Sequence, residues 1–270
     1  MGASSIASWR AGAGKMCIMA GCFRASTQQI SASGTKSEQT ETFANGAMSA
    51  VFRDALLSKL VYREGGHWPS DVYQVGTQAL GFPSDFFVDD KIGLKSALFY
   101  DAARGEFIYA FAGTDGASGA DWGATVAHAT IGVSPQLRRA LSSVRLLAKQ
   151  RNGNLTLTGL SWGGALAAAA ASAYGLQARV FNPGAVSSSG PWANHRGPDR
   201  VSAYILLGDP VNLLQDLHPI VPDSFGTGIY LSPRSNMGLL HWAVPEMLLN
   251  WHWIDSVMDS PDFDSYRDDH

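Results

Sequence analysis

Ser161 lies in the stretch whose residue types and order point most directly to nucleophilic chemistry. Residues 159–163 read G-L-S-W-G, a G-x-S-x-G motif, with an alternating strand-like run at 155–158 and an alanine-rich run at 165–172. Strand, tight turn and helix form the context of a nucleophile elbow. The glycines keep side chains out of the turn, and the helix N-terminus directs positive potential at developing negative charge. The stretch predicts a serine nucleophile.

A serine hydroxyl needs a base to take its proton and a third group to orient that base. In hydrolases built on this elbow the chain order is serine, acid, histidine, so the search begins after Ser161. Asp209 follows the apolar run 201–207, at a strand end where the reactive edge of a parallel sheet lies. Asp209 is therefore the preferred acid, ahead of three later aspartates: Asp216, Asp223 and Asp255.

Two histidines compete for the role of base. His241 lies in the run L-L-H-W, and His252 lies in N-W-H-W-I-D-S-V. His218 is closer to Asp209 in sequence and is a weaker third candidate. The residues alone leave this choice open, and the remaining histidines before the acid are interpreted as structural or exposed: His67, His128 and His195.

An oxyanion hole needs backbone N–H groups already in place where the tetrahedral oxygen forms. One is expected from Trp162, the residue after the nucleophile, and the second from Thr114, which follows the strand-like run 106–112. The bulky ring of Trp162 is also a candidate for tuning substrate choice.

The elements around these residues predict the fold class. The runs 95–100 and 106–112 form a hairpin, and 135–150 carries apolar residues at helical spacing. Strand and helix then alternate, which predicts an α/β fold with a mainly parallel sheet flanked by helices. Four further elements are expected: helices at 47–62 and 72–80, and strands at 178–182 and 201–207.

Composition limits the remaining function classes. The 270 residues carry a net charge of −3, which gives no reason to expect a nucleic acid partner. No apolar run approaches the roughly 18–20 residues that a membrane span needs. Cys17 and Cys22 form neither a zinc pattern nor a disulfide framework, and no cofactor or metal ion is predicted.

The domain organisation is expected to have three parts. Residues 1–45 are rich in small and polar residues and predict a flexible leader, 46–260 form the catalytic domain, and 261–270 form an acidic tail. The segment 16–22 ends Ala-Gly-Cys and faintly resembles a lipoprotein signal. Its apolar part is shorter than the ~7–15 residues of a signal core, so a disordered leader is preferred.

Several motifs together resemble the class 3 lipase family. Its patterns F-R-G-T/S, N/D-W and T-G-H-S-L-G-G-A-L are similar to residues 110–114, 121–122 and 158–167, and its acid motif D-x-V to Asp209-Pro210-Val211. A bacterial branch, with phospholipases and exported effectors among its members, is similar over roughly residues 50–258. Its features here are 59–62, 181–184 and 214–216, which read K-L-V-Y, F-N-P-G and L-Q-D.

The resemblance implies an α/β-hydrolase fold with Ser161 as nucleophile, Asp209 as acid and Thr114 in the oxyanion hole. It favours His252 over His241, because H-W-I-D-S-V is similar to the H-x-M-D-x-V ending of the bacterial branch. The chain departs from the family at three positions, where Leu160 and Trp162 flank the serine and Ala112 replaces the common arginine.

The expected function is that of a serine esterase acting on lipid esters, of the lipase or phospholipase A type. A transient contact with a membrane surface is expected, and 117–133 is either a lid or an ordinary loop. Secretion or delivery as an effector is favoured over a cytoplasmic location. The alternatives are a non-catalytic hydrolase-fold binding protein, which the intact Ser/Asp/His order disfavours, and a thioesterase or protease using the same triad.

Overall fold

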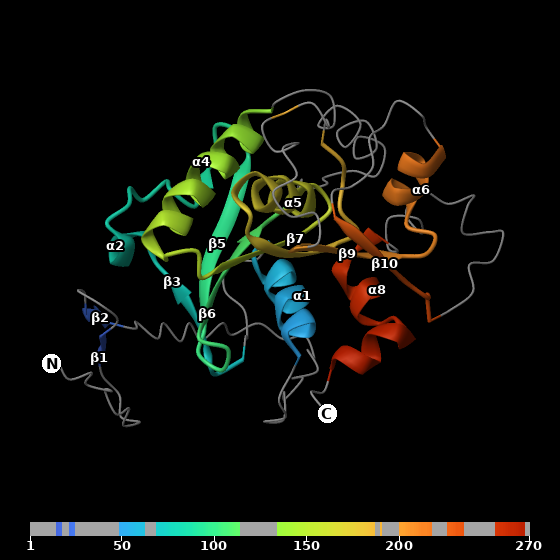
Figure 1. Ribbon diagram of the computed structural model, residues 1–270, viewed down its shortest axis with the longest axis horizontal. Helices are drawn as coiled ribbons and strands as arrows, with labels where there is room; N and C mark the ends of the chain where they lie inside the picture. The colour runs from blue at the N-terminus through green and yellow to red at the C-terminus, as the bar shows by residue number, and fades with distance from the viewer. Residues whose placement is uncertain are drawn as a thin grey trace, which may run out of the picture. The chain divides into compact units, whose positions relative to one another are not determined.

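The structure is a computed structural model that divides into two compact units, Met1–Thr42 and Phe43–His270 (Figure 1). In the first unit, β1 (Lys15–Cys17) pairs antiparallel with β2 (Cys22–Arg24). The leader predicted at 1–45 thus contains a short hairpin, and the predicted boundary at 45 stays a prediction. The structure describes residues 15–17, 22–24, 49–62, 69–113, 134–186, 190, 200–217, 226–234 and 252–267.

The second unit is built on one eight-stranded sheet with the path β10-β9-β8-β7-β6-β5-β3, and β4 pairs with β5 beside it. The strands from β6 to β10 are parallel, whereas β3, β4 and β6 run antiparallel to β5. The strands are β3 (Val72–Val75), β4 (Val88–Asp89), β5 (Leu94–Asp101), β6 (Glu106–Phe111), β7 (Leu155–Leu160), β8 (Gln177–Phe181), β9 (Val201–Leu206) and β10 (Thr227–Leu231).

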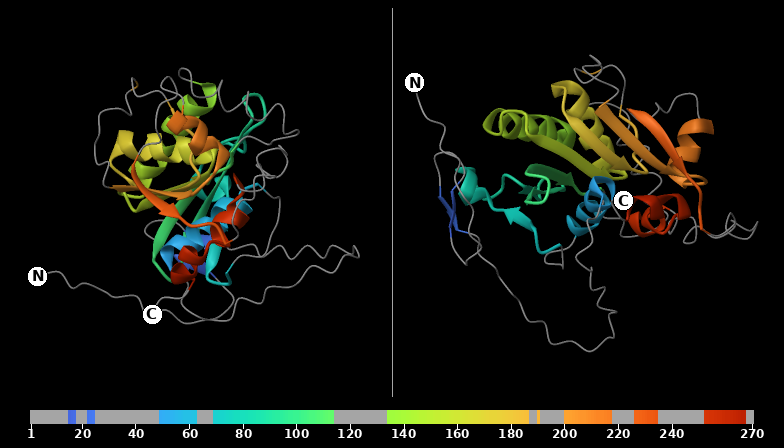
Figure 2. Two further views of the ribbon diagram at one scale, coloured as in Figure 1. Left: turned by 90° about the vertical axis from the view of Figure 1, so that its right-hand side faces the viewer. Right: turned by 60° about the horizontal axis from the view of Figure 1, so that its bottom comes forward.

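Helices cover both faces of this sheet (Figure 2). Two longer helices, α4 and α5, lie on one face, and α1 and α8 lie on the other (Figures 1 and 2). This mainly parallel sheet between two helical layers is an α/β-hydrolase fold and confirms the predicted fold class. The helices are α1 (Ala50–Leu60), α2 (Thr77–Leu80), α4 (Pro135–Gln150), α5 (Trp162–Tyr174), α6 (Pro210–Leu217), α8 (Ile254–Met258) and the 3₁₀ helix η4 (Pro261–Tyr266). None of those in the described ranges is long and apolar enough to cross a membrane.

α4 begins and ends where its sequence predicts. The Ser134 hydroxyl caps it by accepting a hydrogen bond from the Leu137 amide at 3.0 Å, and Pro135 occupies the first turn, where its missing N–H is harmless. The apolar residues at helical spacing are buried against the core of the sheet face: Leu137, Ala140, Val144 and Leu147.

α5 is a helix of small residues that is buried over most of its length. Its residues from Trp162 to Ser172 are all buried, and six of the ten after Trp162 are alanines. Alanine gives high helix propensity with little bulk, so the helix fits between α4 and the sheet. Gly175 ends it in the left-handed conformation at φ 68°.

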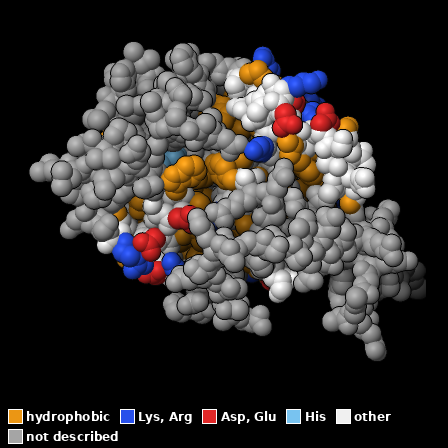
Figure 3. Space-filling model, turned by 180° about the vertical axis from the view of Figure 1, so that it is seen from behind, with side chains coloured by type: hydrophobic (Ala, Val, Ile, Leu, Met, Phe, Trp, Pro, Cys, Tyr) orange, Lys and Arg blue, Asp and Glu red, His pale blue; other side chains and the backbone are white. Residues whose placement is uncertain are grey.

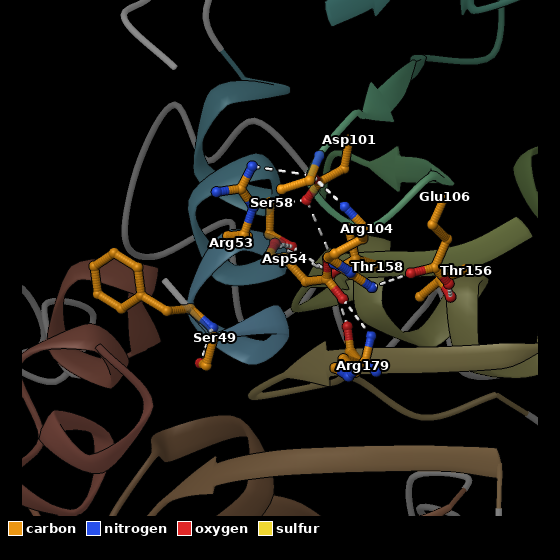
Figure 4. Close-up of polar contacts among 12 residues, drawn as sticks. Ser49, Arg53, Asp54, Ser58, Asp101, Arg104, Glu106, Thr156, Thr158 and Arg179 are labelled. Atoms are coloured by element: carbon orange, nitrogen blue, oxygen red, sulfur yellow. Dashed lines mark hydrogen bonds and ion pairs between the residues drawn. The ribbon is translucent and has the colours of Figure 1, made fainter. Parts of the chain in front are cut away.

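A buried ionic network joins α1 to the sheet (Figure 4). Asp54 contacts the guanidinium groups of Arg104 and Arg179 at 2.7 Å each, and Arg53 contacts Asp101 at 2.6 Å. Burial raises the pKa of the Asp54 carboxyl, and the two arginines oppose that rise. Asp101 ends β5 at the hairpin, so the network lies toward the edge of the sheet opposite the end of β7.

Two predicted elements need correction. The helix expected at 72–80 is a strand, β3, followed by the single turn α2, because Gly76 separates them and β3 pairs with β5. The acidic tail expected at 261–270 begins with η4, whose Phe263 is fully buried with its ring centroid 6.2 Å from those of Phe52 and Phe181. Burial of this ring makes η4 part of the domain.

The two ends of the described domain are joined. Ser49 caps α1 by accepting a hydrogen bond from the Phe52 amide, and its hydroxyl donates to the carbonyl of Tyr266 in η4. The first helix and the last helix therefore lie side by side.

Candidate active site

Ser161 occupies a strained turn between β7 and α5. Its backbone has φ 57° and ψ −125°, a conformation that L-residues rarely adopt and that marks functional sites. The Ser161 amide donates to the Phe181 carbonyl at 3.1 Å, and the Ser161 carbonyl accepts from the amides of Gly184 at 2.9 Å and Ala165 at 3.0 Å. These bonds hold the turn in the geometry of a nucleophile elbow.

Two glycines allow this turn to pack closely. A Cβ atom on Gly163 would lie 2.2 Å from the Phe111 carbonyl oxygen, and one on Gly159 would lie 2.5 Å from the Gly163 carbonyl carbon. Both distances are far below van der Waals contact. The first turn of α5 therefore touches the end of β6 and the end of β7, and glycine is required at both positions.

The Asp209 and His252 side chains meet in the interior. The His252 Nδ1 atom lies 2.6 Å from Asp209 Oδ2, and both residues are buried, at 3% and 1% exposure for His252 and Asp209. Because a carboxylate oxygen only accepts hydrogen bonds, Nδ1 carries the proton and donates a hydrogen bond to Asp209. This tautomer leaves the ring lone pair on Nε2, the atom that takes the serine proton in triad chemistry.

The second oxygen of Asp209 is held by the start of α6. Asp209 Oδ1 accepts hydrogen bonds from the backbone amides of Val211 at 3.0 Å and Asn212 at 2.9 Å, and from the Asn212 side-chain amide at 2.8 Å. Asp209 thus acts as the N-cap of α6, where the helix dipole favours negative charge. The carboxylate is fixed on one side by a helix and presents its other oxygen to His252.

The end of β6 lies beside Ser161. A Cβ atom on Gly113 would be 3.4 Å from the Ser161 Cβ and 2.5 Å from the Tyr62 hydroxyl oxygen. The Gly113 amide donates to that hydroxyl at 2.6 Å. The Gly113 N–H is therefore engaged by Tyr62. Thr114 lies outside the described residues.

Trp162 differs from the expectation for its side chain. Its ring is 2% exposed within the core shared with α4, and its Nε1 donates to Gln136 Oε1 at 2.6 Å. The ring is therefore packed in the core and bonded to α4, an environment that does not support the expectation that it shapes substrate choice. The backbone amide is at the first position of α5, one of the N–H groups that a helix leaves without an intrahelical partner.

The other sequence candidates separate from this cluster. Asp255 lies in α8 and forms an exposed ion pair with Lys59 at 2.5 Å, and Asp216 lies in α6. The segment 117–133 is also outside the described residues, together with four residues: His218, Asp223, His241 and Trp242.

Trp253 lies at the surface beside the buried histidine. It is 39% exposed, and its ring meets that of Tyr62 edge to face at 6.4 Å. In the space-filling view, histidine atoms border a group of hydrophobic side chains (Figure 3). Trp253 therefore presents a partly exposed aromatic ring next to His252.

Three contributors to the site were missed from sequence: Tyr62, Asn182 and Asn212. Asn182 is fully buried, and its side chain donates to the His252 carbonyl at 3.2 Å. Tyr62 and Asn182 lie in segments that carry the family resemblance, but no spacing rule indicated their contacts. Asn212 had a usable signal, since it is three residues after an aspartate that precedes proline, a helix-start pattern.

Comparison with known proteins identifies the family. A family model described as phospholipase-like, the Tle-like phospholipase domain, matches residues 53–245. The chain belongs to the family of Tle-like phospholipase domains. Among curated proteins, the extracellular phospholipase A1 of Serratia liquefaciens is 28% identical over 232 residues, which cover 76% of this chain and 68% of that protein. Among solved structures, the Rhizomucor miehei lipase–propeptide complex aligns with a TM-score of 0.44 and 15% identity, over 68% of this chain and 67% of the other.

Proposed function

We propose that this Tle-like phospholipase domain is a serine hydrolase that cleaves carboxylic esters of phospholipids by a phospholipase A reaction. Ser161 is the nucleophile, His252 the general base and Asp209 the residue that orients it. The observation that carries the proposal is the 2.6 Å contact between His252 Nδ1 and Asp209 Oδ2. One segment, 181–184, also connects the other parts of the site. It forms hydrogen bonds with the backbone of the strained Ser161 and, through the Asn182 side chain, with the carbonyl of His252.

In the first half-reaction, the Ser161 hydroxyl attacks the ester carbonyl carbon while His252 Nε2 takes its proton. Asp209 stabilises the imidazolium that forms and keeps the ring in one orientation. His252 then gives the proton to the glycerol oxygen, and the lysolipid leaves an acyl group on Ser161. Burial of the pair strengthens these electrostatic interactions, because water does not screen them.

The developing oxyanion is held by backbone amides. We assign one to Trp162 at the N-terminus of α5 and the second to Thr114, which follows β6 in the sequence. Fixed N–H donors of this kind stabilise the tetrahedral oxygen at little reorganisation cost. In the second half-reaction, water replaces the alcohol, gives its proton to His252 and releases the fatty acid from Ser161.

The family match and the phospholipase A1 relative support a phospholipid substrate over a triglyceride. The relative is named as extracellular, which supports secretion of this chain. Trp253 supports a transient contact with the lipid surface. A thioesterase or protease would use the same triad, so the choice of substrate is tested directly.

The experiment compares the unaltered protein with Ser161→Ala on vesicles of a phosphatidylglycerol or phosphatidylethanolamine carrying two different acyl chains. Mass spectrometry is expected to detect one free fatty acid and one lysolipid, which also reports the acyl position. Ser172→Ala on the same helix is the matched control and should retain activity. Release of fatty acid by Ser161→Ala would disprove the nucleophile. Absence of products from the unaltered protein, with turnover of an acyl-thioester or a peptide, would favour the alternatives.

A further inference from the structure

Asn182 is a buried asparagine directly after β8, held in a backbone conformation that few residues adopt. Its φ is 37°, and its side chain is fully buried. Asparagine tolerates positive φ better than most residues, but glycine does so at no steric cost. Backbone geometry alone therefore does not explain why a side chain with both a donor and an acceptor is present here.

The side chain and backbone of Asn182 connect three parts of the chain. The Asn182 amide donates to the Tyr204 carbonyl at 2.8 Å, and its Oδ1 accepts from the Leu206 amide at 2.8 Å. Both partners lie in β9. The Nδ2 group donates to the carbonyl of His252 at 3.2 Å. One side chain thus joins the end of β9 to the backbone of the histidine.

Neighbouring hydrogen bonds link Asn182 to the other two residues of the site, Asp209 and Ser161. The Leu206 carbonyl accepts from the Asp209 amide at 2.9 Å, so the strand end that Asn182 holds also sets the position of the acid. The preceding residue, Phe181, accepts from the Ser161 amide at 3.1 Å. Segments that are distant in sequence therefore meet at Asn182 and its neighbour.

The location of His252 explains why such a connection matters. His252 comes before α8, and its ring is fixed to Asp209 through Nδ1. A ring held only through Nδ1 can still change its orientation when its backbone shifts. A displacement of about 1 Å can lower the rate about 100-fold. A second attachment at the His252 carbonyl restricts that shift.

We infer that Asn182 is a positioning residue, which fixes the His252 backbone to the strand end that carries Asp209 and so aims the imidazole at Ser161. This inference rests on the proposed function. It assigns a catalytic consequence to a residue that touches neither substrate nor the reacting atoms.

Two substitutions separate positioning from simple structural support. Asn182→Asp keeps an oxygen for the Leu206 amide but replaces the donor to His252 by a second acceptor, which faces the carbonyl. Asn182→Gly removes both side-chain bonds and suits the positive φ. The matched control is Ser143→Ala on α4, which deletes a buried hydroxyl that accepts from Tyr109 and donates to the Ala140 carbonyl.

Both Asn182 variants are expected to lose about 10- to 100-fold in kcat with KM within about twofold, measured on a soluble p-nitrophenyl ester. The downfield NMR signal of the His252 Nδ1 proton should shift or broaden in both. Ser143→Ala should lower thermal stability and leave kcat and that signal unchanged. Wild-type kcat and an unchanged signal in the two folded Asn182 variants would overturn the inference.

Two further measurements keep the test decisive. If neither Asn182 variant folds, hydrogen exchange in the unaltered chain decides, because the Asn182 side-chain amide protons should exchange far more slowly than those of exposed Asn154. Equal rates would overturn the inference. If Ser161→Ala retained turnover, the proposed function would fail, whereas the Nδ1 signal in the Asn182 variants would still report on the positioning of His252.

Discussion

The hydroxyl of Tyr62 accepts a hydrogen bond from the Gly113 amide across 2.6 Å, and this contact joins the C-terminal end of α1 to the end of β6. α1 lies on the face of the sheet opposite α5, yet it reaches the loop that follows β6, where an oxyanion donor is expected. The end of β6 thus contacts Tyr62, which follows α1 on one face, and the first turn of α5 on the other.

Replacing Tyr62 by phenylalanine should therefore reduce catalysis more than it reduces stability. The Gly113 amide loses its partner, so the strand end is released, and we expect kcat to fall about 10-fold with a loss of about 1 kcal/mol in the free energy of unfolding. Tyr73→Phe, at an exposed tyrosine of β3, is the control. Equal kcat values for the two variants would show that Tyr62 does not influence the oxyanion loop.

Asp209→Asn should lower kcat by roughly 10³- to 10⁴-fold, by analogy with the loss seen when a triad aspartate becomes asparagine. The asparagine can present an N–H to His252 and favour the wrong tautomer, while the bonds to the start of α6 are largely kept. Ester turnover and circular dichroism together measure the effect. Asp255→Asn, at the surface of α8, should behave like the unaltered protein, and a comparable loss there would argue against Asp209 as the acid.

Gly163→Ala should impair both folding and activity, because the added methyl group would lie 2.2 Å from the Phe111 carbonyl. Either β6 or the elbow must shift, which we expect to cost about 3 kcal/mol or more in the free energy of unfolding. Urea denaturation and ester turnover provide the two readouts. Gly76→Ala meets no atom within 4 Å and serves as the control. A fully active and stable Gly163→Ala protein would contradict the close packing of the elbow.

Arg179→Met should destabilise the domain without changing the chemistry. Its removal leaves the fully buried Asp54 carboxylate with one guanidinium instead of two, and we expect a loss of about 3 kcal/mol. Arg234→Met removes an exposed arginine that pairs with Asp259 and Asp264, and should have little effect on the free energy of unfolding, because water screens these pairs. Urea denaturation distinguishes them, and kcat of the folded protein should match the unaltered enzyme in both. Similar losses in the two variants would argue against the buried network as a stabilising feature.

Trp162→Phe tests the finding that this ring faces the core. The variant keeps an aromatic ring but loses the bond to Gln136, so we expect the free energy of unfolding to fall by about 1 kcal/mol and the preference among acyl chain lengths to stay unchanged. Gln136→Leu should give a similar loss. A changed chain-length preference would show instead that the indole reaches the substrate.

The sequence predicted those elements whose signals are local. Serine and proline mark the start of α4, and glycines flank the elbow, so 135–150 and the turn at Ser161 were correctly predicted. Asp209 was preferred as the acid because it follows an apolar strand, and its role as the acid stays a proposal. Of the two histidines, the structure describes His252, and its contact with Asp209 supports the preference that the family resemblance gave.

The remainder depends on contacts between segments that are distant in sequence. Nothing near Asn182 reveals that its side chain meets a carbonyl 70 residues later. β10 was missed because Thr227–Leu231 is exposed along most of its length and lacks the alternation of a half-buried strand. η4 was taken for a tail because its acidic residues obscure one buried ring, Phe263.

The bond between Ser49 and the Tyr266 carbonyl has a topological consequence. Because the first and last elements of the domain adjoin, the fold does not require its polypeptide to start and stop at these positions. A short peptide joining them, with new termini opened at the hairpin 102–105 between β5 and β6, should yield a circular permutant that folds to the same sheet. Because its two ends lie next to each other, the domain should also tolerate insertion into a surface loop of another protein.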